Sequence, residues 1–479
     1  MDFIVEEKEY TFKELEQEIF RLVCRAGAEV TQAILKRKDE EIFRDLDRER
    51  YKSEGFRKTS IKTIYGVVTY SRRVYRTQLD DGKTAFVYLL DQYLGLEKIG
   101  LVSENLAEKI AELATEATFR ETAETISNTT GLSISAQGAW GIVQCLGERI
   151  KDEEACDVAR MRSGTSKGKK TLPVLFEEMD GVWVRQQGEH HEKKPMQEIK
   201  VAVTYEGWDA EKEKQQRSTL VEKHVVAGIE DSKSFHEKRE ADIRKRYNAD
   251  EIMHRIVNGD GGSWIGEPND PDAIVQLDRF HVHKEIRKQI ADKEVIQGIE
   301  EYLSEKDIKG MLSYIKMYAD SVAGNDEEDK RSENALKLLK YLSNNKEGLI
   351  PWQDRGLRLP AAPEGVIYKG MGVQENQNCT VITLRMKHRR MRWSRNGGNN
   401  MAKVLARKEN QELRETIKRY AEPLTFKGEI TEAVKILSAA KSPKKDGKGN
   451  SYADKWNVHM PILDAVLTEA RRYFRVVSI

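Results

Sequence analysis

The chain has 479 residues, which is too long for one compact core and predicts two to four domains. Its 81 Lys and Arg balance 80 Asp and Glu, so the net charge of +1 excludes a global attraction to nucleic acid, and any basic surface must come from local clustering. A hydrophobic share of 39% argues against a disordered chain.

The termini and the cysteines bear on the compartment. The N-terminus lacks the order of a signal peptide, and no apolar run approaches the roughly 20 residues that span a bilayer, so we expect a cytoplasmic protein. The four cysteines lie far apart without Cys-x-x-Cys spacing, which disfavours a zinc ribbon and a disulfide framework. We interpret them as buried free thiols.

Residues 1–160 are predicted to form an N-terminal DNA-binding region of helices and a small β-element. Residues 11–50 have apolar positions at helical spacing and no proline, which predicts a long amphipathic helix. Two β-rich runs then flank Gly66, and Arg72 and Arg73 follow them. Arginines interleaved with tyrosines suit DNA contact, although a solvated strand face has the same pattern.

Residues 103–148 are predicted to be helical. Helices over 120–127 and 135–146 flank a glycine turn at 130–131, and Ser133 or Ser135 is a suitable cap for the second helix. This arrangement fits a DNA-binding helix-turn-helix and equally an ordinary packed helix pair.

The remainder of the chain divides by composition. The small, polar and basic stretch 161–170 is the clearest candidate for an interdomain linker. After it we expect the first part of a catalytic core at 171–290, an all-helical insertion at 291–350, the second part of the core at 351–420, and a helical tail at 421–479.

Two predicted strands lead into aspartates that are followed by glycine. The strand 172–179 leads into Asp180, and the strand 252–257 leads into Asp260. Taken singly, each pair is more typical of a turn. However, a hairpin with an acid, then a helix, then a parallel strand with a second acid is the order of a ribonuclease H-like sheet. Two adjacent carboxylates repel unless cations lie between them, which predicts two Mg²⁺ or Mn²⁺ ions about 3.5–4 Å apart.

A third acid is expected from a later helix. Glu375 is the best candidate because a basic tract follows it, and Glu364 is the alternative. The tract 385–408 has nine Lys and Arg and no acid, whereas a solvated helix face normally mixes both signs. We expect it to contact DNA through Arg385, Lys387, Arg389, Arg390, Arg392, Trp393 and Arg395.

Five sequence strings carry a resemblance to a known family. They are DGVW at 180–183, YEGW at 205–208, DGGSW at 260–264, LDRFH at 277–281 and RWSRNG at 392–397, with MA at 401–402. Together, over about residues 55–405, they resemble the ISLre-type insertion-sequence transposases, which are bacterial DDE enzymes. The chain departs from that family by having Asn376 after Glu375, and residues 380–383 have a strand-like composition where the family has a helix.

The resemblance implies a fold and an activity. It implies an α/β ribonuclease H-like core interrupted by a helical insertion, with Asp180, Asp260 and Glu375 as catalytic metal ligands. Asp278 and His281 are similar to the Asp-x-x-His element of Mutator-like transposases and imply a supporting role. The implied partners are element ends and target DNA in the bacterial cytosol, bound by a homodimer or higher oligomer.

Other functions remain open at this stage. A metal-dependent nuclease on the same fold would use the same acids, and a non-catalytic DNA-binding regulator derived from a transposase would have lost one of them. A zinc hydrolase using His281 and His283 is disfavoured because alternate residues of a helix diverge.

Overall fold

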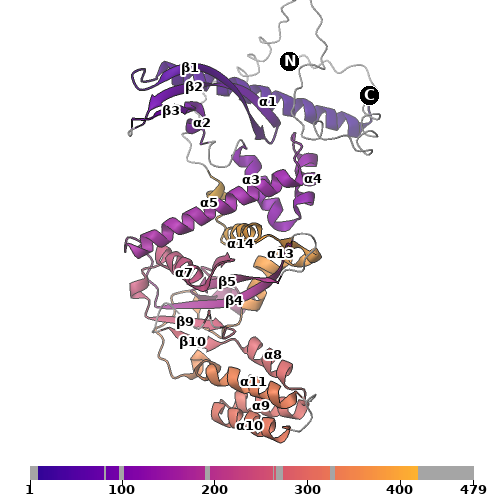
Figure 1. Cartoon of the computed structure of the whole chain (residues 1–479), viewed down its shortest axis with the longest axis vertical. Helices are drawn as coiled ribbons and strands as arrows, with labels where there is room; N and C mark the ends of the chain where they lie inside the picture. The colour runs from indigo at the N-terminus through magenta and orange to yellow at the C-terminus, as the bar shows by residue number, and fades with distance from the viewer. Residues whose placement is uncertain are drawn as a thin grey trace, which may run out of the picture. The chain divides into compact units, whose positions relative to one another are not determined.

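A computed structural model of the protein describes residues 9–79, 82–95, 102–188, 195–262, 264–265, 273–323 and 330–418. Over these residues the chain is a mixed α/β protein (Figure 1). The predicted helical tail at 421–479 lies outside the described residues.

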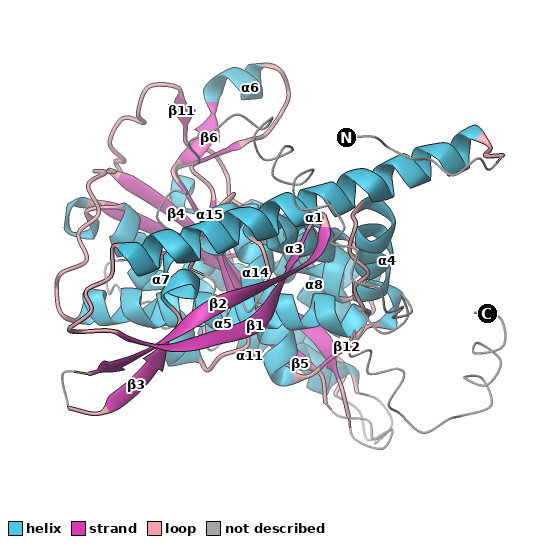
Figure 2. Ribbon diagram, turned by 90° about the horizontal axis from the view of Figure 1, so that it is seen from above, coloured by secondary structure: helices cyan, strands magenta, loops and turns pink. Residues whose placement is uncertain are grey.

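The N-terminal part consists of a long helix and a three-stranded antiparallel sheet. Thr11 and Glu14 form a capping box that begins α1 (Phe12–Arg44), which confirms the predicted amphipathic helix. Figure 2 shows α1 lying along the sheet, and Gln32 donates to the carbonyl of Thr69 at 2.6 Å. The strands of this sheet, in the order β1-β2-β3, are β1 (Lys52–Thr63), β2 (Gly66–Gln78) and β3 (Thr84–Val87). The short helix α2 (Leu89–Tyr93) follows them.

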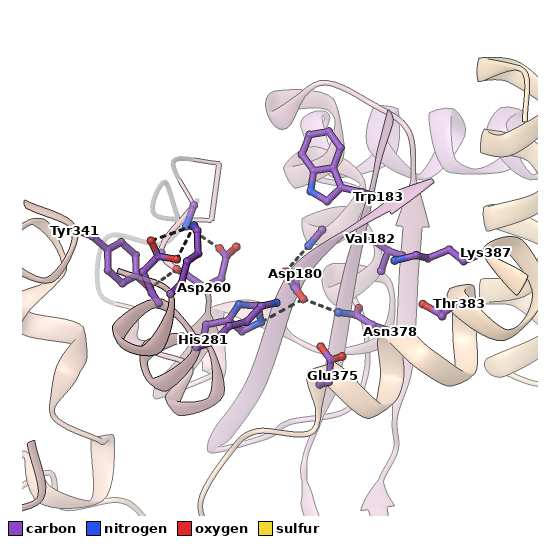
Figure 3. A pocket seen from close by; sticks show the side chains of 16 residues that line it. Asp180, Val182, Trp183, Asp260, His281, Tyr341, Glu375, Asn378, Thr383 and Lys387 are labelled. Carbon is purple, nitrogen blue, oxygen red and sulfur yellow. Dashed lines mark hydrogen bonds and ion pairs between the residues drawn. The ribbon is translucent and has the colours of Figure 1, made fainter. Parts of the chain in front are cut away.

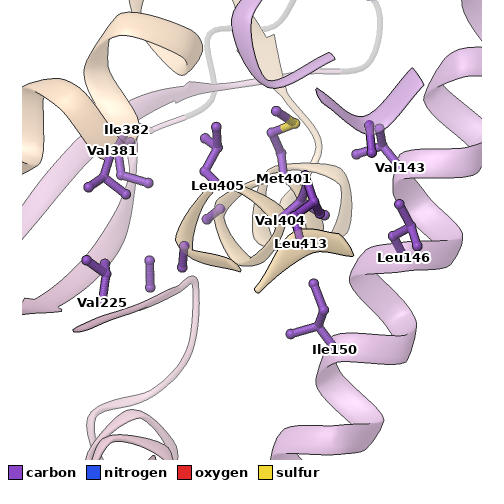
Figure 4. Close-up of a cluster of buried hydrophobic side chains, with 14 of the residues drawn as sticks. Val143, Leu146, Ile150, Val225, Val381, Ile382, Met401, Val404, Leu405 and Leu413 are labelled. Carbon is purple, nitrogen blue, oxygen red and sulfur yellow. The ribbon is translucent and has the colours of Figure 1, made fainter. Parts of the chain in front are cut away.

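Three helices follow, α3 (Glu104–Glu116), α4 (Phe119–Thr129) and α5 (Ala136–Arg162). Two of them, α3 and α5, pack against α14 (Arg395–Glu409), which in turn packs against the main sheet. Of the two candidate caps, Ser135 and not Ser133 caps α5, and α5 continues to Arg162, well beyond the predicted end at 146. Apolar residues of these helices, the sheet and α14 form one continuous hydrophobic core, part of which is drawn in Figure 4.

The predicted linker at 161–170 therefore does not separate two cores, and this expectation is corrected. The stretch after α5 is itself attached to the sheet layer. The amide of Gly168 donates to the carbonyl of Arg244 at 2.8 Å, and Lys170 forms a β-bridge with Tyr247. A glycine-rich, basic composition is typical of a linker, but composition alone does not determine that the preceding helix, α5, shares its core with the sheet.

The main sheet has the order β10-β9-β4-β5-β8, with β12 paired to the end of β4. Pairing is antiparallel between β4, β5 and β8 and parallel between β4, β9 and β10. The helix α7 (Ser232–Arg246) connects β8 to β9. The strands are β4 (Val174–Gln186), β5 (Gln197–Tyr205), β8 (His224–Gly228), β9 (His254–Gly259), β10 (Ile274–Leu277) and β12 (Arg392–Trp393).

Asp180 lies inside β4, so the prediction that this strand ends at 179 is wrong. Its neighbours Met179 and Gly181 both pair with β5, because the strand continues as one arm of a hairpin. Smaller elements lie beside the sheet: β6 (Gly207–Asp209), α6 (Ala210–Lys214), β7 (Leu220–Val221), η1 (Ala249–Glu251) and β11 (Val366–Ile367).

The predicted helical insertion is present and has its own hydrophobic core. It consists of α8 (Arg279–Gln289), α9 (Lys293–Ser304), α10 (Ile308–Ser321) and α11 (Arg331–Asn344), followed by η2 (Lys346–Leu349) and η3 (Trp352–Asp354). The insertion begins at Arg279, which is earlier than the expected residue 291. The helix α8 is therefore both part of the insertion and, as shown below, part of the site.

After the insertion the chain returns to the sheet through a continuous helical segment. It comprises α12 (Gln374–Gln377), a π-helical stretch η4 (Asn378–Thr383) and α13 (Leu384–Met386). The strand-like interpretation of 380–383 is therefore wrong. Val381 and Ile382 are buried in the main core, and this packing overrides the weak helix propensity of β-branched residues. The last elements are η5 (His388–Arg390), β12, α14 and α15 (Leu413–Ile417).

Two further expectations concern cysteines and membranes. Cys24 is a buried free thiol, but Cys145, Cys156 and Cys379 are exposed, so the prediction of burial is wrong for these three. Within the described ranges, the helices lack the combination of length and apolar character that a bilayer crossing demands.

Candidate functional site

The pairing of β4 with β9 places the two predicted aspartates side by side. These strands are parallel, and Met179 and Gly259 are partners across them. Neighbouring strands lie about 4.8 Å apart, so the next residues, Asp180 and Asp260, lie at the same level. Both line one pocket of about 610 Å³ (Figure 3). Burial raises the pKa of Asp260, and the charge of Asp180 raises it further, while a hydrogen bond from the amide of Gly262 acts against both.

Glu375 and His281 complete a compact cluster with Asp180. Glu375 is carried by α12 and His281 by α8, and the ligand atoms of the three side chains all lie within 4.8 Å of one another. Nε2 of His281 lies 3.5 Å from Oδ2 of Asp180. The interaction with Asp180 raises the pKa of His281 in spite of its partial burial. All three predicted acids line one pocket, but only Asp180 and Glu375 belong to the compact cluster, in which His281 and not Asp260 is the third member.

Two side-chain amides that were not predicted, those of Asn378 and Gln374, help to orient Asp180. Nδ2 of Asn378 donates to Oδ2 of Asp180 at 2.6 Å, and the backbone amide of Gly181 donates to Oδ1 at 2.7 Å. Nε2 of Gln374 in turn donates to Oδ1 of Asn378 at 2.9 Å. Gln374 and Asn378 are one helical turn apart, a spacing that sequence reasoning could have used once 374–386 was recognised as helical.

Asp278 supports the site from behind. It is buried and caps α8, accepting hydrogen bonds from the amides of Phe280 at 2.8 Å and His281 at 3.3 Å. Asp278 therefore holds the helix that carries His281 and does not line the pocket.

The alternative metal ligands considered from the sequence, His283 and Glu364, do not line the pocket. Nδ1 of His283 lies 3.1 Å from Oε1 of Glu300 within the insertion, so His281 and His283 do not face a common ion. In the part of the chain that the structure describes, Asp180, His281 and Glu375 form the one group of His, Cys, Asp or Glu side chains with metal-ligand spacing.

The predicted DNA-contacting tract is divided between core and surface. Arg385 is buried, its Nε donates to the carbonyl of Ala114 at 2.5 Å, and its guanidinium lies over the rings of Phe119 and Trp393. Trp393 is buried and donates from Nε1 to the carbonyl of Met386 at 3.0 Å. The prediction that Arg385 and Trp393 contact DNA is therefore wrong, because both side chains hold α3, α4 and the sheet together.

The exposed members of the tract are Lys387, Arg390, Arg392 and Arg395. Of these, Lys387 lines the pocket. The side chain of Arg389 lies outside the described part of the structure.

The arginines of β2 are also structural. Nε of Arg72 lies 2.7 Å from Asp91, and Nη1 of Arg73 lies 2.6 Å from Asp39. Both guanidiniums stack on aromatic rings, Arg72 on Tyr88 and Arg73 on Phe43 and Phe56. They are engaged within the N-terminal part, which corrects their prediction as DNA contacts.

The fold and the site define a mixed α/β protein that gathers two aspartates, a glutamate and a histidine beside two parallel strands. The chain belongs to an uncharacterised protein family, UPF0236, whose model matches residues 6–422. A relative described as the UPF0236 protein in the vanSb 3′ region of Streptococcus gallolyticus is 26% identical over 432 residues, which cover 87% of each chain.

The division of the basic tract predicts opposite effects of two neighbouring substitutions. Arg385→Ala removes a buried hydrogen bond and two cation–π contacts, and we expect it to lower the free energy of unfolding by about 2–4 kcal/mol. Lys387→Ala, two residues later, should change it by less than about 0.5 kcal/mol because this side chain is exposed. Urea unfolding of both variants measures the difference, and equal midpoints would contradict the assignment.

Proposed function

We propose that the protein is a DDE transposase of the ISLre-type insertion-sequence class, which cleaves DNA at element ends and joins the 3′-hydroxyl ends to target DNA. The observation that carries the proposal is the convergence of Asp180, Asp260 and Glu375 in one polar pocket. These are the residues to which the resemblance to the ISLre-type transposases carries the catalytic roles.

The sheet supports a ribonuclease H-like core. Three antiparallel strands, β4, β5 and β8, are followed by a helix and then by two strands, β9 and β10, parallel to β4. This is the strand order expected above for a sheet that brings two carboxylates together, and the helical insertion lies between the second and the third acid.

The donor set fits divalent metal ions. Three carboxylates and one imidazole offer oxygen and nitrogen ligands, which suit Mn²⁺ as well as Mg²⁺. Burial raises the pKa of Asp260 most, and the charge of Asp180 raises it further, so a cation bound beside these carboxylates would favour their ionised form. Asp180, Asp260 and Glu375 would hold two ions, and His281 would complete the shell of the one beside Asp180. When bound, such ions activate the attacking hydroxyl and stabilise the leaving oxygen.

The walls of the pocket suit a phosphodiester substrate. Lys284 and Lys288, one turn apart on α8, line one wall, and Lys387 lines the pocket beyond α13. All three are exposed, and the ammonium group of Lys288 pairs with Glu285 at 3.0 Å, so Lys284 and Lys387 are the better placed contacts for phosphate oxygens. Trp183 is 50% exposed at the rim, where its ring offers a stacking surface for a base (Figure 3). These contacts take the place of the ones predicted for Arg385 and Trp393.

The first test removes each acid in turn. We expect Asp180→Asn, Asp260→Asn and Glu375→Gln each to slow cleavage by about 100-fold or more, equivalent to about 2.7 kcal/mol, because each removes charge that neutralises the metals. The control is Glu364→Gln, which lies away from the pocket and should cleave at the wild-type rate. The assay uses Mg²⁺ or Mn²⁺ and DNA that carries the sequences flanking the protein's own gene.

Two outcomes of this assay would change the conclusion. Wild-type rates in the three pocket variants would reject the metal assignment. Cleavage by the wild type without joining of a pre-cut 3′-hydroxyl end would identify a nuclease.

The second test concerns His281. Because imidazole is a better ligand for Mn²⁺ than for Mg²⁺, we expect His281→Ala to lower the affinity for Mn²⁺ by about tenfold, or about 1.4 kcal/mol, and the affinity for Mg²⁺ by less. His283→Ala is a matched control on the same helix and should bind both ions like the wild type. Isothermal titration calorimetry measures the affinities. Wild-type Mn²⁺ binding by His281→Ala would exclude His281 from the metal shell.

The third test concerns the lysines. We expect Lys387→Ala and Lys284→Ala each to weaken DNA binding and to reduce the slope of log affinity against log salt by about 1, because each contact with a phosphate releases a counterion. Lys337→Ala on α11, away from the pocket, serves as the control. Fluorescence anisotropy at several salt concentrations gives the slopes, and an unchanged slope for both pocket variants would remove them from the DNA path.

A further inference from the structure

A second carboxylate of β4 lies buried beneath the site. Glu178 is two residues before Asp180, so both side chains are on the same face of the strand, and Glu178 is fully buried. It does not line the pocket. A buried carboxylate costs several kcal/mol unless hydrogen-bond donors surround it, so its partners reveal its role.

Three of those partners are backbone amides at the start of α12. Glu178 accepts hydrogen bonds from the amides of Gly372 at 3.1 Å, Val373 at 3.1 Å and Gln374 at 3.3 Å. The first amides of a helix lack partners within the helix, so a carboxylate there fixes where the helix begins. Gly372 has a φ of 131°, which a residue with a side chain rarely adopts, and this turn directs the three amides toward Glu178. The helix anchored in this way carries Glu375 and Asn378 into the pocket.

Glu178 is also connected, through Asn258, to the helix α8 that carries His281. Nδ2 of Asn258 donates both to Oε2 of Glu178 at 2.9 Å and to Oδ2 of Asp278 at 2.8 Å. Asp278 caps α8 at the amides of Phe280 and His281. A last donor, the hydroxyl of Tyr205, lies 2.7 Å from Oε1 of Glu178. One buried network therefore connects the starts of both helices that supply ligands from outside the sheet.

We propose that Glu178 is the positioning residue of the metal centre and that it sets where Glu375 and His281 stand relative to Asp180. The proposal rests on the proposed function for its metal, although the anchoring itself does not. Both oxygens of a carboxylate accept hydrogen bonds, whereas a glutamine would direct its own NH₂ group against at least one of these donors. Glu178→Gln is therefore expected to release the start of α12 while changing the side-chain volume very little.

The neighbouring residue offers a matched control. Glu177 is equally buried but points to the opposite face of β4, where it accepts from Nε of Arg255 at 2.7 Å and pairs with Arg239 at 3.3 Å. Glu177→Gln makes the same chemical change in the same strand. It should lower the melting temperature without affecting the site, since its partners lie on α7 and β9 and not on α8 or α12.

The experiment measures amide hydrogen exchange and Mn²⁺ affinity in the full chain. For Glu178→Gln we expect faster exchange at 372–378 and an Mn²⁺ affinity lower by about 10-fold to 100-fold, the usual cost of losing a residue that orients metal ligands. For Glu177→Gln both should equal the wild type. Asn258→Ala breaks only the connection to Asp278, and it should speed exchange at 280–281 more than at 372–378.

The outcomes separate the two proposals. Wild-type exchange at 372–378 in Glu178→Gln, or an equal increase in Glu177→Gln, would overturn the positioning role. If Glu178→Gln does not fold, Asn258→Ala decides, and wild-type exchange at 280–281 would overturn the network. A wild-type protein that binds no Mn²⁺ would instead refute the proposed function, while the exchange data would still test the anchor.

Discussion

The parallel pairing of β4 with β9 is the constraint on which the site depends. The partnership of Met179 with Gly259 places Asp180 beside Asp260, although the two residues are far apart in sequence. A register shift of one residue would direct one carboxylate to the opposite face of the sheet, since side chains alternate along a strand. The register is secured by burial on both faces, with Phe176 and Val174 in the main core and Met179 in a second cluster.

Beneath the pocket, two adjacent glutamates of β4, Glu177 and Glu178, are buried on opposite faces of the strand, and each has its own hydrogen-bond or ion-pair partners. Glu177 forms ion pairs with Arg255 and Arg239 and thereby joins β4 to β9 and α7. Glu178 instead accepts hydrogen bonds from amide groups that connect it to the starts of α8 and α12. Arg255 and Arg239 hold the pKa of Glu177 below its ordinary value despite the opposing effect of burial. The two adjacent glutamates thus have different roles: Glu177 attaches α7 to the sheet, and Glu178 aligns the helices that complete the site.

The helices before the sheet belong to the same core as the sheet itself. At the crossing of α5 and α14, a Cβ atom on Gly147 would lie 2.3 Å from Cβ of Asn400, so only glycine permits this approach. Lys403, 1% exposed, pairs there with Glu154 of α5 and Glu230 before α7. Arg407 and Lys408, the last cations of the basic tract, also pair with acids, Glu412 and Glu116, and among the described members of the tract Lys387 lines the pocket.

Local patterns in the sequence were enough to indicate much of this protein. Apolar runs that lead into Asp180 and Asp260 indicated the two central strands, helical spacing indicated α1 and the insertion, and the serines at 133 and 135 bracketed the start of α5. These features depend on neighbours in sequence, so periodicity and capping reveal them. Tertiary structure alone decided that Val381 and Ile382 are helical, that Arg385 is buried while Lys387 is exposed, that His281 lies within ligand distance of Asp180 and Glu375, and that Glu178 is buried against the start of α12. Each of those outcomes depends on which distant groups surround a side chain, and burial and hydrogen bonding across the fold leave no periodic trace in the sequence.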